Sequence, residues 1–287
     1  MTAPVDPPLR IDAALALGRQ RLQASPSAAL DSEMLRCHVL DRPRSYLFTW
    51  PERTLDETQQ QAFLALLARR QGGEPVAHLI GEREFYGRPF RVSAATLIPR
   101  PDTETLIEQV LELPLPARTR AVDLGTGSGA IGITLALERP GWQVQLVDLS
   151  DAALQVAADN AARLGAKVAL SQGSWLSGCT GPFDLIVSNP PYIDPDDHHL
   201  QQGDVRFEPR TALVAQQQGL ADLASIIVQA VDYLAPSGWL VLEHGYDQGL
   251  SVRQLLARQG YTEIRTALDL GGNERVTLGQ LKQLRSL

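Results

Sequence analysis

Apolar residues in the first 75 positions recur at the spacing of amphipathic helices. One helix is predicted at residues 8–22. A second begins after Ser25-Pro26, where a capping side chain precedes a proline. A third begins at a capping-box pattern at 54–57 and ends at Gly72-Gly73. The pattern therefore predicts a small helical domain over residues 1–75.

Strands and helices alternate from about residue 119 onward. Short apolar runs typical of buried strands are separated by amphipathic helical segments. Repeated βα units predict an α/β fold with a mostly parallel sheet covered by helices on both faces, and the last two strands form a closing pair. The predicted strands cover residues 120–124, 142–147, 167–170, 183–187, 239–242, 261–267 and 275–278, and the predicted helices cover 130–138, 151–164, 220–234 and 251–258.

A third kind of pattern connects these two parts. Residues 85–92 place aromatic and β-branched residues around a glycine, which is typical of a β-hairpin. We therefore expect three regions: a helical domain at 1–75, a β-hairpin linker at 76–100, and an α/β domain at 101–287.

Composition and charge exclude several classes of protein. The formal net charge is −7, from 26 Lys and Arg against 33 Asp and Glu, so we expect no direct binding of nucleic acid through its phosphates. No run approaches the roughly 18 apolar residues that a membrane span needs, and residues 1–30 lack a secretory signal. Cys37 and Cys179 are far apart and form no CxxC pair. We expect a cytoplasmic protein with neither a membrane nor a metal site.

Three alternating glycines lie between a predicted strand and a predicted helix, in the segment 123–129. Glycine adopts positive φ and lets the backbone approach a ligand. Residues 127–132 also match the GxGxxG pattern of dinucleotide sites, and Asp148, at the end of the next strand, suits a ribose diol. The carboxylate of Asp123 would repel a pyrophosphate and favours a ligand with a cationic amino-acid end, such as S-adenosylmethionine. A nicotinamide dinucleotide and a turn without a ligand remain as alternatives.

An Asn-Pro-Pro-Tyr segment follows the predicted strand at 183–187, where a doubly wound sheet keeps its binding crevice. The prolines stiffen it, so the Asn189 side chain and the Pro190 carbonyl can accept both hydrogens of a planar NH2 group. Tyr192 can cover a flat substrate group. An amide or aryl amine nitrogen is a poor nucleophile, so we expect Asn189, Pro190, Pro191 and Tyr192 to act in catalysis by positioning it. A strand-ending turn is the alternative.

Together these segments resemble the class I S-adenosylmethionine-dependent methyltransferases. More narrowly, nearly the whole chain resembles the bacterial peptide chain release factor glutamine methyltransferases. The segments that carry this resemblance are 73–79, 83–86, 96–104, 123–129, 188–194, 199–209, 242–245 and 273–279.

The resemblance implies a Rossmann-like methyltransferase sheet in the domain at 101–287, with S-adenosyl-L-methionine as cofactor. It implies methylation of the glutamine amide in the Gly-Gly-Gln loop of class I release factors, and thus an influence on translation termination. It also implies that the N-terminal helices help to hold the release factor and that residues 189–192 clamp the substrate amide. The family's cofactor positions fall on Gly125, Thr126, Gly127, Ser128, Gly129, Asp148, Trp175 and Asn189.

Several alternatives stay open. Asn-Pro-Pro-Tyr is shared with enzymes that methylate exocyclic amino groups of nucleic acid bases. A nucleic-acid amino methyltransferase, a methyltransferase of a ribosomal protein glutamine and a non-catalytic cofactor-binding module are therefore rivals. We interpret Glu243-His244 as structural support, because methyl transfer to an amide requires no acid–base pair. We interpret the loop with Asp194, Asp196, Asp197, His198 and His199 as solvated, because no spacing fixes these residues on one face as a metal site would require.

Overall fold

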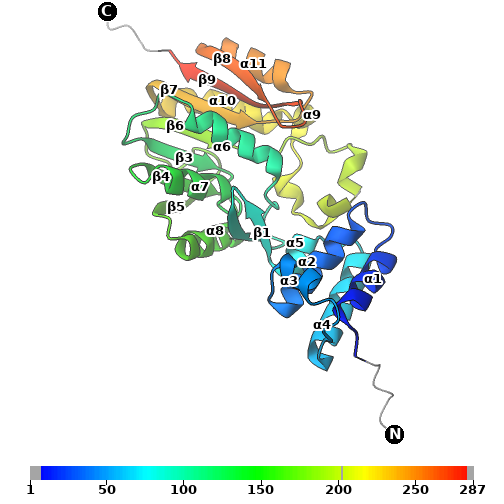
Figure 1. Ribbon diagram of the computed structural model, residues 1–287. Coiled ribbons are helices and arrows are strands. Elements are labelled where there is room, and N and C mark those ends of the chain that lie inside the picture. The colour runs from blue at the N-terminus through cyan, green and yellow to red at the C-terminus, as the bar shows by residue number, and fades with distance from the viewer. Residues whose placement is uncertain (1–7, 202, 283–287) are drawn as a thin grey trace, which may run out of the picture. The chain divides into compact units, whose positions relative to one another are not determined.

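The computed structural model describes residues 8–201 and 203–282. The chain divides into two units, one that ends at Gly81 and one that begins at Glu82 (Figure 1). The unit boundary follows a short helix that the sequence pattern did not predict and precedes the predicted hairpin. 

The N-terminal unit is helical, as its apolar spacing predicts. Its core contains Leu35, Phe63 and Leu67, each without solvent exposure. The capping box at the start of the long helix lies two residues later than the sequence pattern placed it, because Asp56 and Gln59 exchange the two capping hydrogen bonds. The helices are α1 (Ile11–Arg21), α2 (Ala28–Leu40), α3 (Arg44–Thr49), α4 (Glu57–Gln71) and α5 (Val76–Ile80).

The second unit begins with the predicted hairpin. Its strands β1 (Glu82–Phe85) and β2 (Arg88–Arg91) pair in antiparallel register around Tyr86-Gly87. The 3-10 helix η1 (Pro101–Thr103) and helix α6 (Glu104–Leu111) follow. The sequence pattern gave no element at α6, although it buries Leu106, Ile107 and Val110 in the core.

A seven-stranded sheet forms the centre of this unit, in the order β5-β4-β3-β6-β7-β9-β8. Neighbouring strands are parallel except at β9, which is antiparallel to both β7 and β8. The predicted fold class, a mostly parallel sheet closed by an antiparallel strand, is confirmed. The strands are β3 (Arg120–Leu124), β4 (Gln143–Asp148), β5 (Val168–Gln172), β6 (Phe183–Ser188), β7 (Leu234–Glu243), β8 (Tyr261–Leu268) and β9 (Glu274–Leu281).

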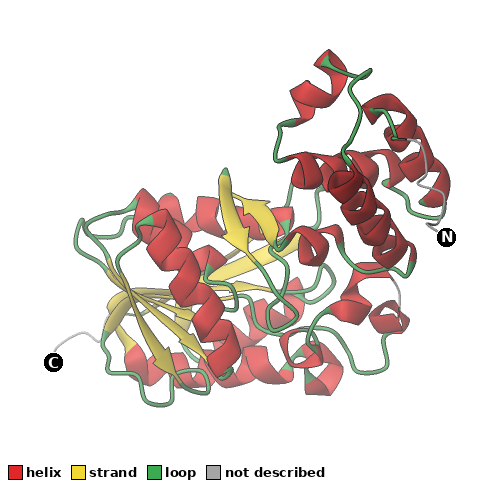
Figure 2. Ribbon diagram, turned by 90° about the horizontal axis from the view of Figure 1, so that it is seen from below, coloured by secondary structure: helices red, strands yellow, loops and turns green. Residues whose placement is uncertain are grey.

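Helices cover both faces of the sheet (Figure 2). Alternate residues of β7 enter different cores: Trp239 and Val241 pack on one side, Leu240 and Leu242 on the other. The first core also holds α6, α7 (Ala130–Glu138) and α8 (Asp151–Leu164), and the second holds α10 (Ala221–Tyr233) and α11 (Gly249–Arg258). None of the helices in the described ranges combines the length and the apolar character that crossing a membrane requires.

The strand order defines where a ligand can bind. From β3 the chain moves outward through β4 and β5, then returns to β6 on the other side of β3. In such sheets the crevice lies at the carboxyl ends of the strands, at the point where the order reverses. That point is between β3 and β6.

Candidate functional site

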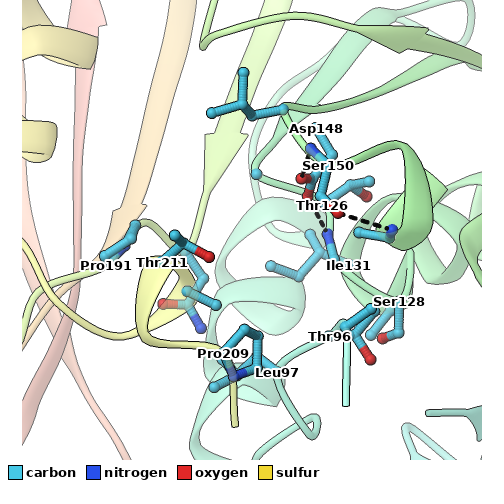
Figure 3. A pocket seen from close by; sticks show the side chains of 18 of the residues that line it. Thr96, Leu97, Thr126, Ser128, Ile131, Asp148, Ser150, Pro191, Pro209 and Thr211 are labelled. Carbon is cyan, nitrogen blue, oxygen red and sulfur yellow. Dashed lines mark hydrogen bonds between the residues drawn. The ribbon is translucent and has the colours of Figure 1, made fainter. Parts of the chain in front are cut away.

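The glycine loop and the Asn-Pro-Pro-Tyr segment leave neighbouring strands at the same edge of the sheet. Leu124 of β3 lies opposite Ser188 of β6, and the Ser188 hydroxyl donates to the Leu124 carbonyl at 2.7 Å. Both segments line one cavity of about 590 Å³, a size typical of small-molecule sites. Thr126 and Ser128 lie across this cavity from Pro191 (Figure 3). The fold therefore brings both sequence motifs to one crevice.

The loop after β3 requires glycine at particular positions. Gly125 and Gly129 have φ angles of +66° and +82°, in the left-handed region. A Cβ atom on Gly129 would lie 2.5 Å from Cδ1 of Ile133 in α7. A Cβ atom here would strain the positive φ and displace the buried Ile133 side chain, so this turn favours glycine. Gly129 itself is not among the residues that line the cavity.

Asp123 lies beneath the loop and not in the cavity wall. Its Oδ2 atom accepts hydrogen bonds from the Thr126 hydroxyl at 2.5 Å and from the Gly132 amide at 3.0 Å. Complete burial raises the pKa of Asp123 to about 7, although both hydrogen bonds oppose that shift. The Asp123 carboxylate thus holds the loop from behind and does not line the cavity. The effect of its charge on the choice of ligand stays a prediction.

Asp148 presents a carboxylate at the end of β4. Its Oδ2 atom accepts from the Gly127 amide at 2.8 Å and its Oδ1 atom from the Ser150 amide at 2.9 Å. A carboxylate has about four lone-pair positions, so two backbone contacts leave acceptor capacity toward the cavity that Asp148 lines. This spare capacity fits the two hydroxyl groups of a ribose.

Trp175 supplies an aromatic surface in the same wall. A Cβ atom on Gly125 would lie only 3.3 Å from Cζ3 of the indole, so the ring packs closely over the glycine loop. Asp222 lines the same cavity as Trp175. The indole thus offers the cavity a flat aromatic surface, which suits a planar base.

The charges in the wall favour a nucleoside with a cationic group over a dinucleotide. Of the described residues that line the cavity, Arg100 is the one basic side chain, and it is paired with the buried carboxylate of Glu208. A pyrophosphate would meet the carboxylates of Asp148 and Asp222 without an unpaired cation. S-adenosylmethionine, which carries a sulfonium and an ammonium group, fits these residues.

The Asn-Pro-Pro-Tyr segment contributes unequally to the cavity. Asn189 and Pro191 line it, whereas Pro190 is buried and Tyr192 packs against the apolar core on the α10 side of the sheet. Burial raises the pKa of Tyr192, whose hydroxyl donates to Oε1 of Glu243 at 3.5 Å. The coverage of a flat substrate group by the Tyr192 ring stays a prediction.

The acidic loop after Tyr192 does not gather a metal site in the described residues. Asp196 is exposed, and His198 lies 3.6 Å from Asp197, a spacing at which a protonated imidazole would form an ion pair. No group of three or more His, Cys, Asp or Glu side chains within residues 8–201 and 203–282 could hold a metal ion. The side chain of His199 lies outside what the structure describes.

Sequence comparison decides the family. Residues 13–81 match the PrmC N-terminal domain, and residues 101–205 match the methyltransferase small domain. The release factor glutamine methyltransferase of Vibrio cholerae is 50% identical over 280 residues, which cover 96% of this chain and 98% of that protein. The chain belongs to the release factor glutamine methyltransferase family. The member from Escherichia coli is 50% identical over 265 residues, 92% of this chain and 96% of that protein.

Membership in the release factor glutamine methyltransferase family confirms the resemblance drawn from the sequence. The chain is an S-adenosylmethionine-dependent methyltransferase, and S-adenosyl-L-methionine is its cofactor.

Solved structures with low sequence identity share the fold of this chain. A methyltransferase from Pyrococcus furiosus has a TM-score of 0.51 at 20% identity, covering 76% of this chain and 98% of that one. The catalytic domain of hMettl16 has a TM-score of 0.56 at 18% identity, covering 77% and 83%.

Sequence reasoning missed several residues of the cavity wall. Thr96, Leu97, Thr103 and Asp222 all line it, and three of these come from the 96–104 segment that carried part of the family resemblance. Their chemistry gives no local signal, because a threonine or leucine is ordinary in any loop. Only the packing of this segment against the strand ends makes these side chains part of a site.

Proposed function

We propose that this chain transfers a methyl group from S-adenosylmethionine to the side-chain amide nitrogen of a glutamine in peptide chain release factors. The glutamine is that of the Gly-Gly-Gln motif of class I release factors, so the enzyme modulates translation termination. One observation carries the proposal: Asn189, at the end of β6, lines the same cavity as the glycine loop, in a chain half identical to proteins named release factor glutamine methyltransferases.

The cofactor's place in this proposal follows from the cavity wall. When bound, S-adenosylmethionine supplies a methyl group activated by a positively charged sulfur. The lone pairs that Asp148 retains suit a ribose, and the Trp175 indole over Gly125 suits adenine. The residues that we propose to hold the cofactor at the cavity wall are Gly125, Thr126, Gly127, Ser128, Asp148, Trp175 and Asn189. Gly129 contributes to this site through the shape of the glycine loop.

The acceptor side of the reaction is a problem of positioning. An amide nitrogen is a weak nucleophile, because its lone pair is delocalised into the carbonyl group. Asn189 and the Pro190 carbonyl offer two acceptors for the two amide hydrogens, which would fix the plane of the group. Each neutral hydrogen bond contributes only about 1 kcal/mol, but correct orientation of the reacting atoms lowers the barrier by several kcal/mol more. The nitrogen becomes acidic once it is methylated, so its proton can leave without a dedicated base.

We assign separate tasks to three regions. Residues 1–75 hold the release factor, and the hairpin region 76–100 links them to the catalytic domain. Residues 101–287, which include Pro191 and Tyr192, bind the cofactor and catalyse methyl transfer. The match of residues 13–81 to the PrmC N-terminal domain and the separate helical unit that ends at Gly81 support this division. Translation takes place in the cytoplasm, so the proposal places the enzyme there. The free thiols of Cys37 and Cys179 are compatible with a reducing compartment.

Mass spectrometry of a recombinant class I release factor tests the function directly. After incubation with this chain and S-adenosylmethionine, we expect one added methyl group on the Gly-Gly-Gln glutamine. Asn189→Ala is expected to abolish the gain while cofactor affinity stays largely intact. Asp196→Ala, an exposed change in the following loop, serves as the matched control and should behave as wild type.

Two results would contradict the proposal at different points. Full methylation by Asn189→Ala would remove Asn189 from the amide clamp. No methylation by the wild-type chain, with cofactor binding demonstrated by calorimetry, would remove the release factor as acceptor. Ribosomal proteins and then nucleic acids would be assayed next, since Asn-Pro-Pro-Tyr is compatible with either acceptor.

A further inference from the structure

A buried glutamine, Gln248, holds the backbone at the end of the Asn-Pro-Pro-Tyr segment. Its Nε2 atom donates to the Tyr192 carbonyl at 3.0 Å and to the Gln218 carbonyl at 3.1 Å. Its Oε1 atom accepts from the Gly245 amide at 2.9 Å. One side chain therefore joins three segments that lie far apart in the sequence.

These hydrogen bonds leave the Gln248 amide only one orientation. Both hydrogens of its NH2 group face carbonyl oxygens, and its own oxygen faces an N–H. If the amide turned over, an oxygen would face two carbonyls and a donor would face a donor. Gln248 is only 8% exposed, and although it is the N-cap residue of α11, its side chain makes no capping hydrogen bond. Its polar atoms thus serve the neighbouring segments and not its own helix.

The turn that contains Gln218 is strained. In α9 (Gln216–Gly219), Gln217 and Gln218 have φ angles of +55° and +59°, in the left-handed region that residues with a Cβ atom rarely adopt. Such a conformation persists only where surrounding contacts determine it, and such positions cluster at functional sites. The hydrogen bond from Gln248 to the Gln218 carbonyl is one of the contacts that hold this turn.

Gly219 brings α9 against the same Tyr192 carbonyl. A Cβ atom on Gly219 would lie 2.0 Å from the Tyr192 carbonyl oxygen and 2.6 Å from Nε2 of Gln248, and its φ is +79°. Because the nearer atom belongs to the backbone, a side chain here would displace Tyr192. We call Gln248 and Gly219 together the Tyr192 clasp.

A shift of the Tyr192 carbonyl would be transmitted to Asn189. The two residues are separated only by Pro190 and Pro191, whose rings fix φ near −65°, so little rotation is available to absorb the shift. Asn189 and Pro191 line the cavity. The position of the Tyr192 backbone therefore affects where Asn189 and the Pro190 carbonyl stand.

We propose that Gln248 and Gly219 are positioning residues for methyl transfer, which fix the Tyr192 carbonyl and thereby the two acceptors offered by Asn189 and Pro190. Neither residue lines the cavity, so both act through the backbone of the Asn-Pro-Pro-Tyr segment. Most residues proposed to hold the cofactor follow β3 and β4, so cofactor affinity should not depend on the clasp. The kinetic consequence rests on the proposed function, whereas the placement of Asn189 does not.

A single-atom change tests Gln248. Gln248→Glu keeps the shape of the side chain but replaces the NH2 group with an oxygen, whose lone pairs would face two carbonyl oxygens. At saturating cofactor and acceptor, we expect kcat on a class I release factor to fall about 10- to 100-fold, the range of a small misplacement of reacting groups. Calorimetry should give a Kd for S-adenosylmethionine within about threefold of wild type. Gln254→Glu, an exposed change on α11, adds the same charge and should behave as wild type.

Two glycines separate misplacement of the segment from loss of stability. Gly219 and Gly260 have similar φ angles of +79° and +83°, so alanine strains the backbone at either, but nothing lies within 4 Å of a Cβ atom on Gly260. Gly219→Ala should lower kcat as Gln248→Glu does. Gly260→Ala should lower only the midpoint of thermal unfolding, and an equal loss of kcat in both variants would overturn the role of Gly219.

Selective isotope labelling tests the placement of Asn189 without an acceptor protein. The chain contains three asparagines, Asn160, Asn189 and Asn273, so ¹⁵N-asparagine labelling yields three side-chain NH2 signals in an NMR spectrum. The signal of Asn189 is identified by its loss in Asn189→Ala. Gln248→Glu and Gly219→Ala should shift this signal and leave that of Asn160 in place.

The outcomes separate failure of the clasp from failure of the proposed function. The positioning role is overturned if both clasp variants keep kcat within about threefold of wild type, if they weaken only cofactor binding, or if the Asn189 signal does not move. A wild-type chain that leaves the release factor unmodified would refute the proposed function, and the NMR comparison would still decide the role of the clasp.

Discussion

Asp148 is expected to be the side chain on which cofactor affinity depends most. Each of its oxygens already accepts one backbone N–H, from Gly127 at 2.8 Å and from Ser150 at 2.9 Å. Asp148 lines the cavity, so its remaining lone pairs can accept from the two hydroxyl groups of a ribose. A hydrogen bond to a charged group contributes about 1.5 to 3 kcal/mol. Loss of two such bonds in Asp148→Ala therefore costs at least about 3 kcal/mol, or about a 100-fold increase in Kd.

A second substitution distinguishes charge and geometry from side-chain size. Asp148→Asn keeps the shape but replaces one acceptor oxygen with an NH2 group, which would face the N–H of either Gly127 or Ser150. We therefore expect Asp148→Asn to bind the cofactor nearly as weakly as Asp148→Ala. Asp151→Ala is the matched control, because Asp151 is exposed at the first position of α8 and its loss changes the net charge equally.

Isothermal titration calorimetry with S-adenosylmethionine measures all four proteins, and a thermal unfolding curve of each verifies that the fold is intact. The control should bind within about twofold of wild type, because a surface charge contributes little at physiological salt. An Asp148→Ala variant that binds within threefold of wild type would refute the assignment of Asp148 to the ribose. Equal weakening by Asp151→Ala would show that overall charge, and not the position of Asp148, is responsible.

Two further predictions concern the glycine loop. Gly129→Ala should lower the free energy of unfolding by about 2 to 4 kcal/mol, because the position has a positive φ and the new Cβ atom would collide with the Ile133 side chain. Gly165→Ala is the control: its φ of +72° is similar, but no atom lies within 4 Å, so it should cost less than half as much. Urea unfolding measures both losses, and equal losses would contradict the effect of the collision. The pKa of Asp123 is raised to about 7, so the folded state binds this proton more tightly than the unfolded chain and stability falls as pH rises from about 4 to about 7. Asp123→Asn should therefore lose less stability than wild type between pH 5 and pH 8, and identical changes in the two proteins would refute this prediction.

The sequence predicts this fold where the signal is local. Alternating apolar runs and glycine-ended helices place most elements of the sheet domain within a few residues, and the hairpin turn at Tyr86-Gly87 is visible from composition. Helix α6 was not predicted because its eight residues follow a proline-rich stretch that is typical of a loop. The short helices α3 and α5 were not predicted because six and five residues are too few to show a helical period of apolar positions.

The residues of the candidate site also differ in how far the sequence predicts them. Gly125 and Asn189 belong to the glycine loop and the Asn-Pro-Pro-Tyr segment, two local motifs whose residue types indicate a binding or catalytic role. Thr103 carries none, because it is 86 residues from Asn189 and reaches it only through the packing of η1 and α6 against the strand ends. Trp175 could be assigned only by family resemblance, since nothing local distinguishes it from any loop tryptophan.

Asp123 and Glu243 share a design that becomes visible only in three dimensions. Asp123 is the residue before the last of β3 and Glu243 is the last of β7, and these strands lie on either side of β6. Neither carboxylate lines the cavity. Asp123 accepts from Thr126 of the glycine loop, and Glu243 accepts from Tyr192 of the Asn-Pro-Pro-Tyr segment. Each buried acid thus holds one of the two motifs from behind, and burial raises the pKa of each to about 7. Because one acid supports the cofactor side and the other the acceptor side, Asp123→Asn should act on cofactor Kd and Glu243→Gln on kcat; a reversal of these two effects would contradict this division.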